Sequence, residues 1–325
     1  MARIGITTTV PAEIIFAAGH TPVDLNNIFI TDPEAPRLTE AAEDAGYPRN
    51  ICGWIKGLYS IVIRSGDFDK IIAVTQGDCS NTHALMETYQ LAGIETIPFA
   101  YPYDRDYDLL KLQMEKLMQA LGTDWQATYA AKRRLDAVRA KVAEIDRLTW
   151  QDGTVSGWHN HLYQVSCSDF NGDPDLFEQE VDAFLAQAAD APEGEEDLRL
   201  AFIGVPPILT DLYDYIERMG ARVVFNEVQR QFAMPAAPED IVEQYRRYTY
   251  PYGVFNRIDD IAAELDRRNI DGVIHYVQSF CFRQIEDMIF REKLDVPILT
   301  IEGDKPGKTD ARTRLRIDSF LEMLR

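Results

Sequence analysis

Short apolar runs alternate with amphipathic stretches along most of the chain. Three runs in the first hundred residues have the length and apolar character of buried strands: RIGITTT, KIIAVTQG and IETIPFA. Two stretches between them have helical periodicity, PAEIIFAAG with Pro11 in its first turn and HALMETYQLAG with Gly93 at its end. Strands separated by helices in this way predict parallel β-α units.

The pattern changes after residue 105 and returns near residue 196. Residues 106–148 contain long stretches of helix formers and no strand candidate, and ADAPEGEEDLRL, rich in Pro, Gly and acid, follows later. A second series of strand and helix patterns begins at LRLAFIGV and ends with VPILTIEGD and TDARTRLRIDSFLEML. We therefore expect an α/β protein with two doubly wound, flavodoxin-like (Rossmann-like) parallel-sheet domains, 1–105 and 196–325, and a helical insertion or linker at 106–195.

Composition agrees with two compact domains, and the net charge disfavours some classes of binding partner. A chain of 325 residues that is 46% hydrophobic can bury more than one core. Its 53 acidic and 33 basic residues give a net charge of -20, which disfavours nucleic acid and anionic membranes as partners. The N-terminal residues lack the pattern of a signal peptide, and no apolar run is long enough to span a bilayer. We expect a soluble, cytoplasmic protein.

Three of the four cysteines stand where a helical pattern begins. Cys79 and Cys281 also follow apolar strand patterns, and Cys52 precedes GWIKGLYSIVIRSG. Ligands of open α/β sheets bind beyond the carboxyl ends of the strands, and the N-terminus of a helix stabilises a thiolate or an anionic cluster. Three thiolates from two domains, meeting across the interdomain cleft, are what a 4Fe-4S cluster with one open iron requires.

Core filling is the alternative for each cysteine, because a free cysteine is among the most buried residue types. Cys167 fits that alternative, since it lies in LYQVSCSDFNGD without a strand-to-helix context. The long, uneven separations of the four do not indicate a disulfide framework, and no C-x-x-C pair is present.

Other polar residues are candidates for acid or base roles. His83 lies one helical turn after Cys79 and could face a cluster, and Glu13 and His20 flank the first predicted helix. Each could instead be a cap or a surface group. The pair His159 and His161 in WHNH has a spacing that suits a metal on a strand rather than on a helix face, and without a carboxylate cluster a hydrogen-bonded pair is favoured.

Four segments together resemble the 2-hydroxyacyl-CoA dehydratase / benzoyl-CoA reductase family of iron-sulfur subunits. They are VPAEIIFAAGHTPVDL, YPRNICGWIKG, TQGDCSNTHAL and the long block from DGVIHYVQSFCFRQ to SFLEML, in the family's order over nearly the whole chain. The resemblance implies two flavodoxin-like domains that hold a 4Fe-4S cluster between them. It maps the three cluster ligands onto Cys52, Cys79 and Cys281.

The resemblance also implies a reaction and partners. Family members act as dimers of like or identical subunits and receive single electrons from an ATP-hydrolysing iron-sulfur activator. They dehydrate 2-hydroxyacyl-CoA thioesters through radicals, as lyases of anaerobic metabolism, or reduce aromatic thioesters. Ser80 follows the second cysteine where the family usually has Asp, so the acyl-CoA substrate stays open.

Two other classes of function remain open at this point. One is an iron-sulfur electron-transfer component, fed by the activator, that reduces a partner protein or a substrate other than a CoA thioester. The other is a metal-free α/β binding protein whose cysteines fill the core.

Overall fold

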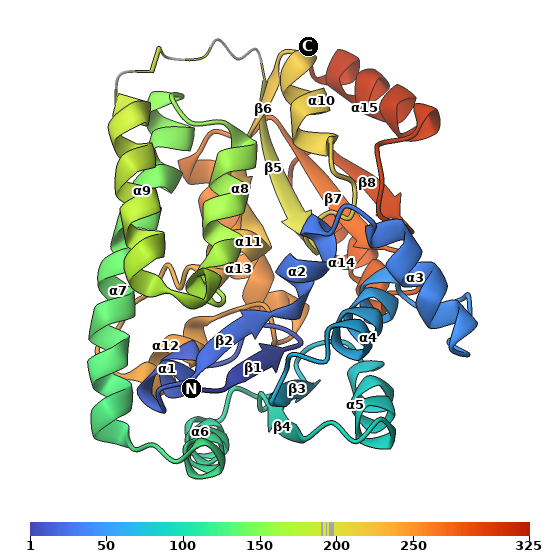
Figure 1. Ribbon diagram of the computed structural model, residues 1–325. Helices are drawn as coiled ribbons and strands as arrows, with labels where there is room; N and C mark the ends of the chain where they lie inside the picture. The colour runs from blue at the N-terminus through green and yellow to red at the C-terminus, as the bar shows by residue number, and fades with distance from the viewer. Residues whose placement is uncertain (190, 193, 195–197) are drawn as a thin grey trace.

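The computed structural model describes residues 1–189, 191–192, 194 and 198–325. These residues form two four-stranded, all-parallel sheets flanked by helices, which confirms the predicted α/β class (Figure 1). The boundary expected in ADAPEGEEDLRL falls largely on residues 190, 193 and 195–197, which lie outside the described residues.

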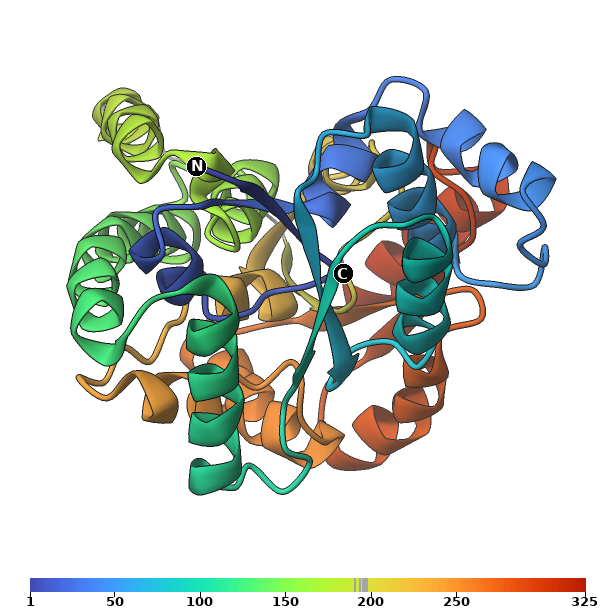
Figure 2. The same ribbon diagram turned by 60° about the horizontal axis from the view of Figure 1, so that its bottom comes forward.

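The first sheet has the strand order β2-β1-β3-β4. Its strands are β1 (Arg3–Ile6), β2 (Thr21–Asp24), β3 (Lys70–Gln76) and β4 (Thr96–Ala100). Its helices are α1 (Ala12–Ala17), α2 (Leu25–Thr31), α3 (Ala35–Asp44), α4 (Gly53–Ser65) and α5 (Thr82–Leu91). The sheet is buried between α1 and α6 (Tyr107–Leu121) on one face and α4 and α5 on the other, as Figure 2 shows with α6 in green and α5 in teal.

The second sheet repeats this order as β6-β5-β7-β8. Its strands are β5 (Leu198–Gly204), β6 (Ala221–Asn226), β7 (Gly272–Gln278) and β8 (Ile298–Gly303). Its helices are α10 (Leu212–Arg218), α11 (Glu227–Phe232), α12 (Ile241–Arg247), α13 (Val254–Arg267), the 3-10 turn η3 (Phe282–Ile285), α14 (Glu286–Lys293) and α15 (Ala311–Leu324).

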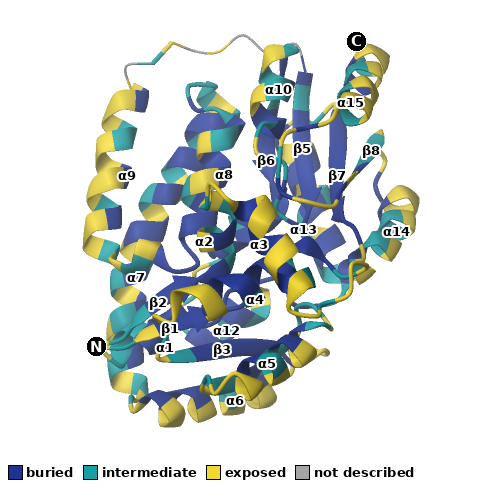
Figure 3. Cartoon of the chain, turned by 45° about the vertical axis from the view of Figure 1, so that its right-hand side comes forward, coloured by how far each residue is buried: buried dark blue, intermediate teal, exposed yellow. Residues whose placement is uncertain are grey.

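Strand β5 shows how the second sheet is buried on both faces. Successive side chains of a strand point to opposite faces, so Leu200 and Phe202 pack with α10 and α15, whereas Ala201 and Ile203 pack with α13 and α14. The central strands of both sheets are accordingly buried almost throughout (Figure 3). This double burial explains why these strands read as continuous apolar runs in the sequence.

Helices connect β4 of the first sheet to β5 of the second, and the segment 106–195 is called the helical insertion below. These helices are α6 (Tyr107–Leu121), α7 (Trp125–Arg147), the π-helical turn η1 (Leu148–Asp152), α8 (Gly157–Ser166), the 3-10 turn η2 (Phe170–Gly172) and α9 (Pro174–Ala189). Side-chain caps mark the starts of three of them, because Asp106, Asp124 and Ser156 each accept a backbone N–H from the first turn. No helix among the described residues is both long and apolar enough to cross a membrane.

Several short elements differ from the sequence prediction. Residues 7–9 lie beyond the end of β1, and the four-residue strand β2 was not predicted. His159 and His161 lie on helix α8. Their spacing would have suited a metal only on a strand, so they do not form the metal pair that was considered. Asp169 caps η2 and holds the connection to α9 through a hydrogen bond to the backbone N–H of Asn171.

Candidate functional site

A cavity of about 650 Å³ lies at the carboxyl ends of the strands of both sheets. Cys52, Cys79 and Cys281 all line it. Cys79 follows the last residue of β3 by three positions, and Cys281 follows the last residue of β7 by three positions. This is the edge at which open parallel sheets bind ligands.

Cys52 is the N-cap residue of α4 and is only 7% exposed. Burial raises the pKa of its thiol to about 12, although the backbone N–H groups of Ile55 and Trp54 point at the sulfur and act to lower it. The N–H donors of the helix start are therefore present, as predicted, but burial has the larger effect on the pKa of Cys52.

Cys79 and Cys281 are half-buried, and in both of them burial raises the pKa of the thiol while backbone N–H groups act to lower it. Cys281 is the N-cap residue of η3, whereas Cys79 lies two residues before the N-cap of α5, Asn81. Burial and then the adjacent Asp78 carboxylate raise the pKa of Cys79 to about 12, against the Asn81 backbone N–H. Burial also raises the pKa of Cys281, against the backbone N–H and the guanidinium of Arg283. The backbone N–H groups at these helix starts act to stabilise the thiolates, as predicted, and burial acts against them.

The three thiols are close enough to act on one another. A charge on Cys52 or Cys281 raises the pKa of Cys79, and a charge on Cys281 raises that of Cys52. Nevertheless, within the described part of the chain no three His, Cys, Asp or Glu side chains come together as the ligands of a single metal ion. The thiols thus share one cavity without converging on one point.

Two glycines let the cysteine-bearing loops approach the second half of the chain. A Cβ atom placed on Gly53, next to Cys52, would lie 2.6 Å from the carbonyl oxygen of Asp304. One placed on Gly77, two residues before Cys79, would lie 2.9 Å from the carbonyl oxygen of Pro251, and Gly77 also has a positive φ of 97°. These close backbone contacts hold the loops of the two halves together around the cavity.

A buried carboxyl pair that sequence reasoning missed also lines the cavity. Asp24 ends β2 and Asp169 caps η2, and the backbone N–H of Asp24 donates to Asp169 Oδ2 at 2.7 Å. Burial, followed by the charge of Asp24, raises the pKa of Asp169 to about 7. Burial also raises the pKa of Asp24. The one available signal was an acidic residue at the end of a strand, but β2 itself was not predicted.

Among the other predicted residues, His161 lines this cavity, whereas those named below do not. His83 is exposed on α5, and His20 accepts a hydrogen bond from the backbone N–H of Ala2. Glu13 is fully buried and accepts hydrogen bonds from Arg139 and Tyr245, both at 2.7 Å. Burial acts to raise its pKa, but the Arg139 charge and the hydrogen bonds from Arg139 and Tyr245 together outweigh burial and hold the pKa of Glu13 below its usual value. Cys167 lies in the apolar core of the helical insertion.

A comparison with family models identifies the group of proteins to which this site belongs. The model described as 2-hydroxyglutaryl-CoA dehydratase, D-component, matches residues 7–324. The chain belongs to this family. The match includes all three cavity cysteines and every strand of the two sheets except β1, so the chain is a dehydratase-type enzyme component. The search of curated proteins gave no match.

Proposed function

We propose that the chain is the 4Fe-4S subunit of a 2-hydroxyacyl-CoA dehydratase-type enzyme, with Cys52, Cys79 and Cys281 as the cluster ligands. The observation that carries the proposal is that three thiols from both halves of the chain line one cavity. A four-iron cluster is a cube whose ligands stand at separate corners. Three thiols that line one cavity would supply the ligands of three of these corners.

The surrounding backbone suits an anionic cluster. N–H groups of Ile55, Asn81 and Arg283 each point at one of the three sulfurs. Such donors stabilise negative charge on metal-bound sulfur. Because the free thiols are protonated at neutral pH, loading the site releases protons and favours neutral to alkaline conditions. When bound, the cluster would supply single electrons and an open Lewis-acidic iron.

The protein's own residues provide for the rest of the reaction. The net dehydration removes hydroxide from C2 and a proton from C3 of the thioester, and it releases a 2-enoyl thioester and water without net oxidation. The Asp24–Asp169 pair lines the same cavity, and its raised pKa values suit a group that takes up and returns a proton near neutral pH. We include in the proposal a dimer of like or identical subunits and an ATP-hydrolysing activator that delivers the electron.

A second candidate is favoured by the charges in the cavity. Asp24, Asp78, Asp169 and Glu180 line it, whereas Arg3, which is 47% exposed, is the one Lys or Arg side chain in the described lining. Such a lining suits a neutral substrate better than the phosphates of CoA. The second candidate is therefore an activator-dependent iron-sulfur enzyme, or electron-transfer component, whose substrate is not a CoA thioester.

Turnover of the anaerobically purified protein separates the two candidates. The assay contains an activator of the family, ATP, a low-potential reductant and 2-hydroxyglutaryl-CoA or its free acid. The first candidate predicts an enoyl thioester from 2-hydroxyglutaryl-CoA. Electron uptake without a change in either compound would contradict dehydration of this thioester and favour the second candidate. A protein that neither binds iron nor accepts electrons would contradict both.

A further inference from the structure

The cavity contains a histidine that the cysteine site does not use. His161, on α8, is 8% exposed and lines the cavity beside Trp158, with ring centroids 5.2 Å apart and planes at 20°. Its Nδ1 lies 3.0 Å from Gln229 Nε2 and 3.3 Å from the Tyr213 hydroxyl. Its Nε2 makes no hydrogen bond to any described residue. This atom is not fully enclosed, so it retains some accessible surface. It therefore keeps access to the cavity.

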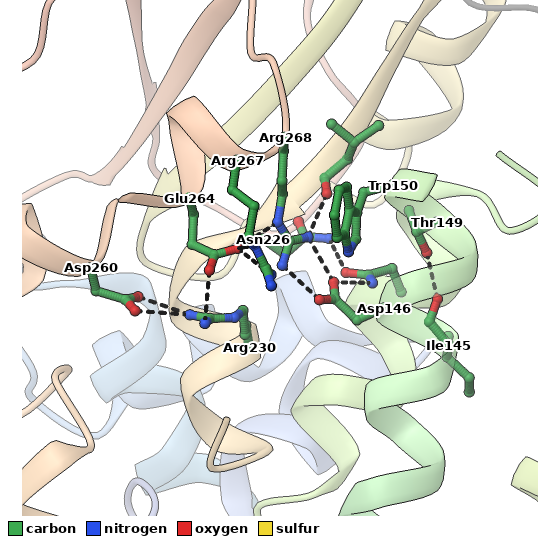
Figure 4. A network of polar contacts seen from close by, with 12 residues as sticks. Ile145, Asp146, Thr149, Trp150, Asn226, Arg230, Asp260, Glu264, Arg267 and Arg268 are labelled. Atoms are coloured by element: carbon green, nitrogen blue, oxygen red, sulfur yellow. Dashed lines mark hydrogen bonds and ion pairs between the residues drawn. The ribbon is translucent and has the colours of Figure 1, made fainter. Parts of the chain in front are cut away.

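A chain of buried hydrogen bonds leads from this ring to a fixed charge. At its far end Arg268 donates to both oxygens of Asp146, at 2.9 and 2.6 Å (Figure 4). Burial acts to raise the pKa of Asp146, but the charge and hydrogen bonds of Arg268 outweigh it and leave the pKa below its usual value. Asp146 is thus a carboxylate, which can only accept hydrogen bonds.

The carboxylate sets the direction of the next hydrogen bonds. Asn160 must present its NH₂ group to Asp146 Oδ1, at 2.9 Å, so its amide oxygen faces Asn226. Asn226 Nδ2 donates to that oxygen at 2.7 Å. The Asn226 oxygen then accepts from the Tyr213 hydroxyl, also at 2.7 Å. A tyrosine has one hydroxyl proton, and here it is committed to Asn226.

The direction continues from Tyr213 to the histidine. With its proton committed, the Tyr213 oxygen can only accept from Gln229, so the NH₂ group of Gln229 faces it, at 3.2 Å. The second hydrogen of that NH₂ group points to His161 Nδ1. Nδ1 is consequently an acceptor and carries no proton.

The ring is also uncharged. Burial lowers the pKa of His161 to about 3 and is the sole cause of the shift. The groups that face the ring are Tyr213 from α10, Gln229 from α11 and Trp158 from its own helix, and none of them carries a charge. A neutral imidazole with an accepting Nδ1 has its proton on Nε2.

We infer that His161 presents a fixed, uncharged Nε2–H donor to the cavity, where it binds a carbonyl or hydroxyl oxygen of the substrate. Tyr213 and Gln229 are positioning residues that act through the ring. An uncharged donor recognises an oxygen acceptor without giving up a proton, which differs from the role of an imidazolium. The identity of the substrate rests on the proposed function, whereas the state of the ring does not.

The state of the ring can be measured directly. Long-range ¹H–¹⁵N spectra of protein labelled on its five histidines distinguish the two neutral tautomers from imidazolium. His161→Gln assigns the signal by its loss. We expect the Nε2–H tautomer from about pH 8 to about pH 5. An Nδ1–H tautomer, or conversion to imidazolium in this range, would overturn the inference.

A matched pair of variants on α10 tests the hydrogen-bonded chain. Tyr213→Phe removes the hydroxyl that orients Gln229, so we expect an admixture of the Nδ1–H form. Tyr215→Phe, which loses a hydroxyl bonded to Asp318, should leave the His161 signal unchanged. A Tyr213→Phe spectrum identical to that of the wild type would contradict the orienting role of this residue.

Ligand probes test whether the donor faces the cavity. High concentrations of acetamide, a neutral oxygen acceptor, should move the Nε2–H resonance, and the absence of any shift would overturn the donor role. If acetamide moves the resonance and 2-hydroxyglutaryl-CoA does not, the proposed substrate is wrong and the donor stands. In turnover, His161→Leu should raise KM about three- to tenfold with a smaller effect on kcat. His161→Gln, which keeps an N–H group, should recover most of that loss.

Discussion

The two halves of the chain are built on the same order of elements but supply different chemistry to the cavity. Each half has a strand, a helix, a second strand, three helices, a third strand, a helical segment and a fourth strand, and the two sheets have the same strand order. In each half a glutamine ends the third strand, and a cysteine follows three residues later, as Gln76 with Cys79 and Gln278 with Cys281.

The halves differ at the helix that precedes the third strand. In the first half this helix, α4, begins after Cys52, whereas in the second half the corresponding helix, α13, begins after Gly253. Each half thus has two corresponding positions, one before the helix that precedes the third strand and one three residues after that strand. Three of these four positions carry a thiol. This asymmetry supports a cluster with one iron that lacks a protein thiolate, and it arises from one residue type in a repeated fold rather than from a different architecture.

The halves also differ in how they meet the helical insertion. The second strand of the first half ends in Asp24, which contacts Asp169. The second strand of the second half ends in Asn226, which contacts Asn160. Corresponding strand ends therefore contact the insertion through a carboxyl pair in one half and an amide pair in the other. Only the carboxyl pair can exchange a proton near neutral pH.

The largest loss of stability is expected from substitutions that break the buried ion pair of each half. Arg257 in the second half pairs with Glu227, and Arg139 of the insertion pairs with Glu13 of the first half, and all four side chains are at most 3% exposed. Arg257→Met or Arg139→Met leaves a buried carboxylate without its cation, which should lower the free energy of unfolding by about 3–5 kcal/mol. Arg133→Met, exposed on α7, is the control.

Urea unfolding measures these losses in each half. Equal, large losses would show that both halves need their buried pair. A loss below about 0.5 kcal/mol in either variant, the size of an ordinary surface effect, would contradict that reading.

A smaller effect is expected from glycines at the corresponding starts of α4 and α13. Gly53→Ala places a Cβ against the Asp304 carbonyl oxygen, so the backbone must shift, at about 1–3 kcal/mol. Around Gly253 the nearest atom to an added Cβ is the Tyr103 hydroxyl at 3.9 Å, so Gly253→Ala should lower the free energy of unfolding by less than about 1 kcal/mol. Thermal unfolding compares the two variants. Equal melting temperatures would show that the two loops are equally tolerant.

The smallest effect should appear when the carboxyl pair is made to resemble the amide pair. The folded-state pKa of Asp169, about 7, lies above its ordinary value of 3.8. Its contribution to stability is thus fully present below about pH 4 and is lost as the pH rises through 7. Asp169→Asn removes the ionising group, so the variant should be more stable than the wild type at about pH 8, by on the order of 1–2 kcal/mol.

Urea midpoints at several pH values test this sign. The advantage of Asp169→Asn should vanish near pH 4, where the wild-type carboxyl is protonated. A variant that is less stable than the wild type at every pH would show that the pair is not strained by its charge.

The long elements could be predicted from the sequence. Strands that are buried on both faces have continuous apolar runs, and long helices have a clear helical periodicity. Strands β3, β5 and β7 and helices α6, α7 and α15 appear where their patterns predict them. Strand β2 has only four residues, one of them Pro22, and helix α8 has His159 and Asn160 among its ten residues. The conformation of β2 and α8 depends on tertiary contacts, which cannot be predicted from the local sequence pattern.

The site could be predicted in part for a similar reason. Cys79 and Cys281 follow recognisable strands, and Cys52 precedes a recognisable helix, so position alone made them candidates. Asp24 and Asp169 are 145 positions apart, and their contact exists only because η2 packs against the end of β2. The hydrogen bonds that orient His161 likewise join residues from separate helices.

Iron and acid-labile sulfide per chain, after anaerobic purification, test the central claim most directly. We predict about four of each in the wild type and in Cys167→Ser, whose thiol lies in the core of the insertion. Cys281→Ser, which removes the one cavity thiol of the second half, should lose both. Full iron and sulfide content in Cys281→Ser, or none in the wild type after reconstitution, would contradict a cluster held between the two halves.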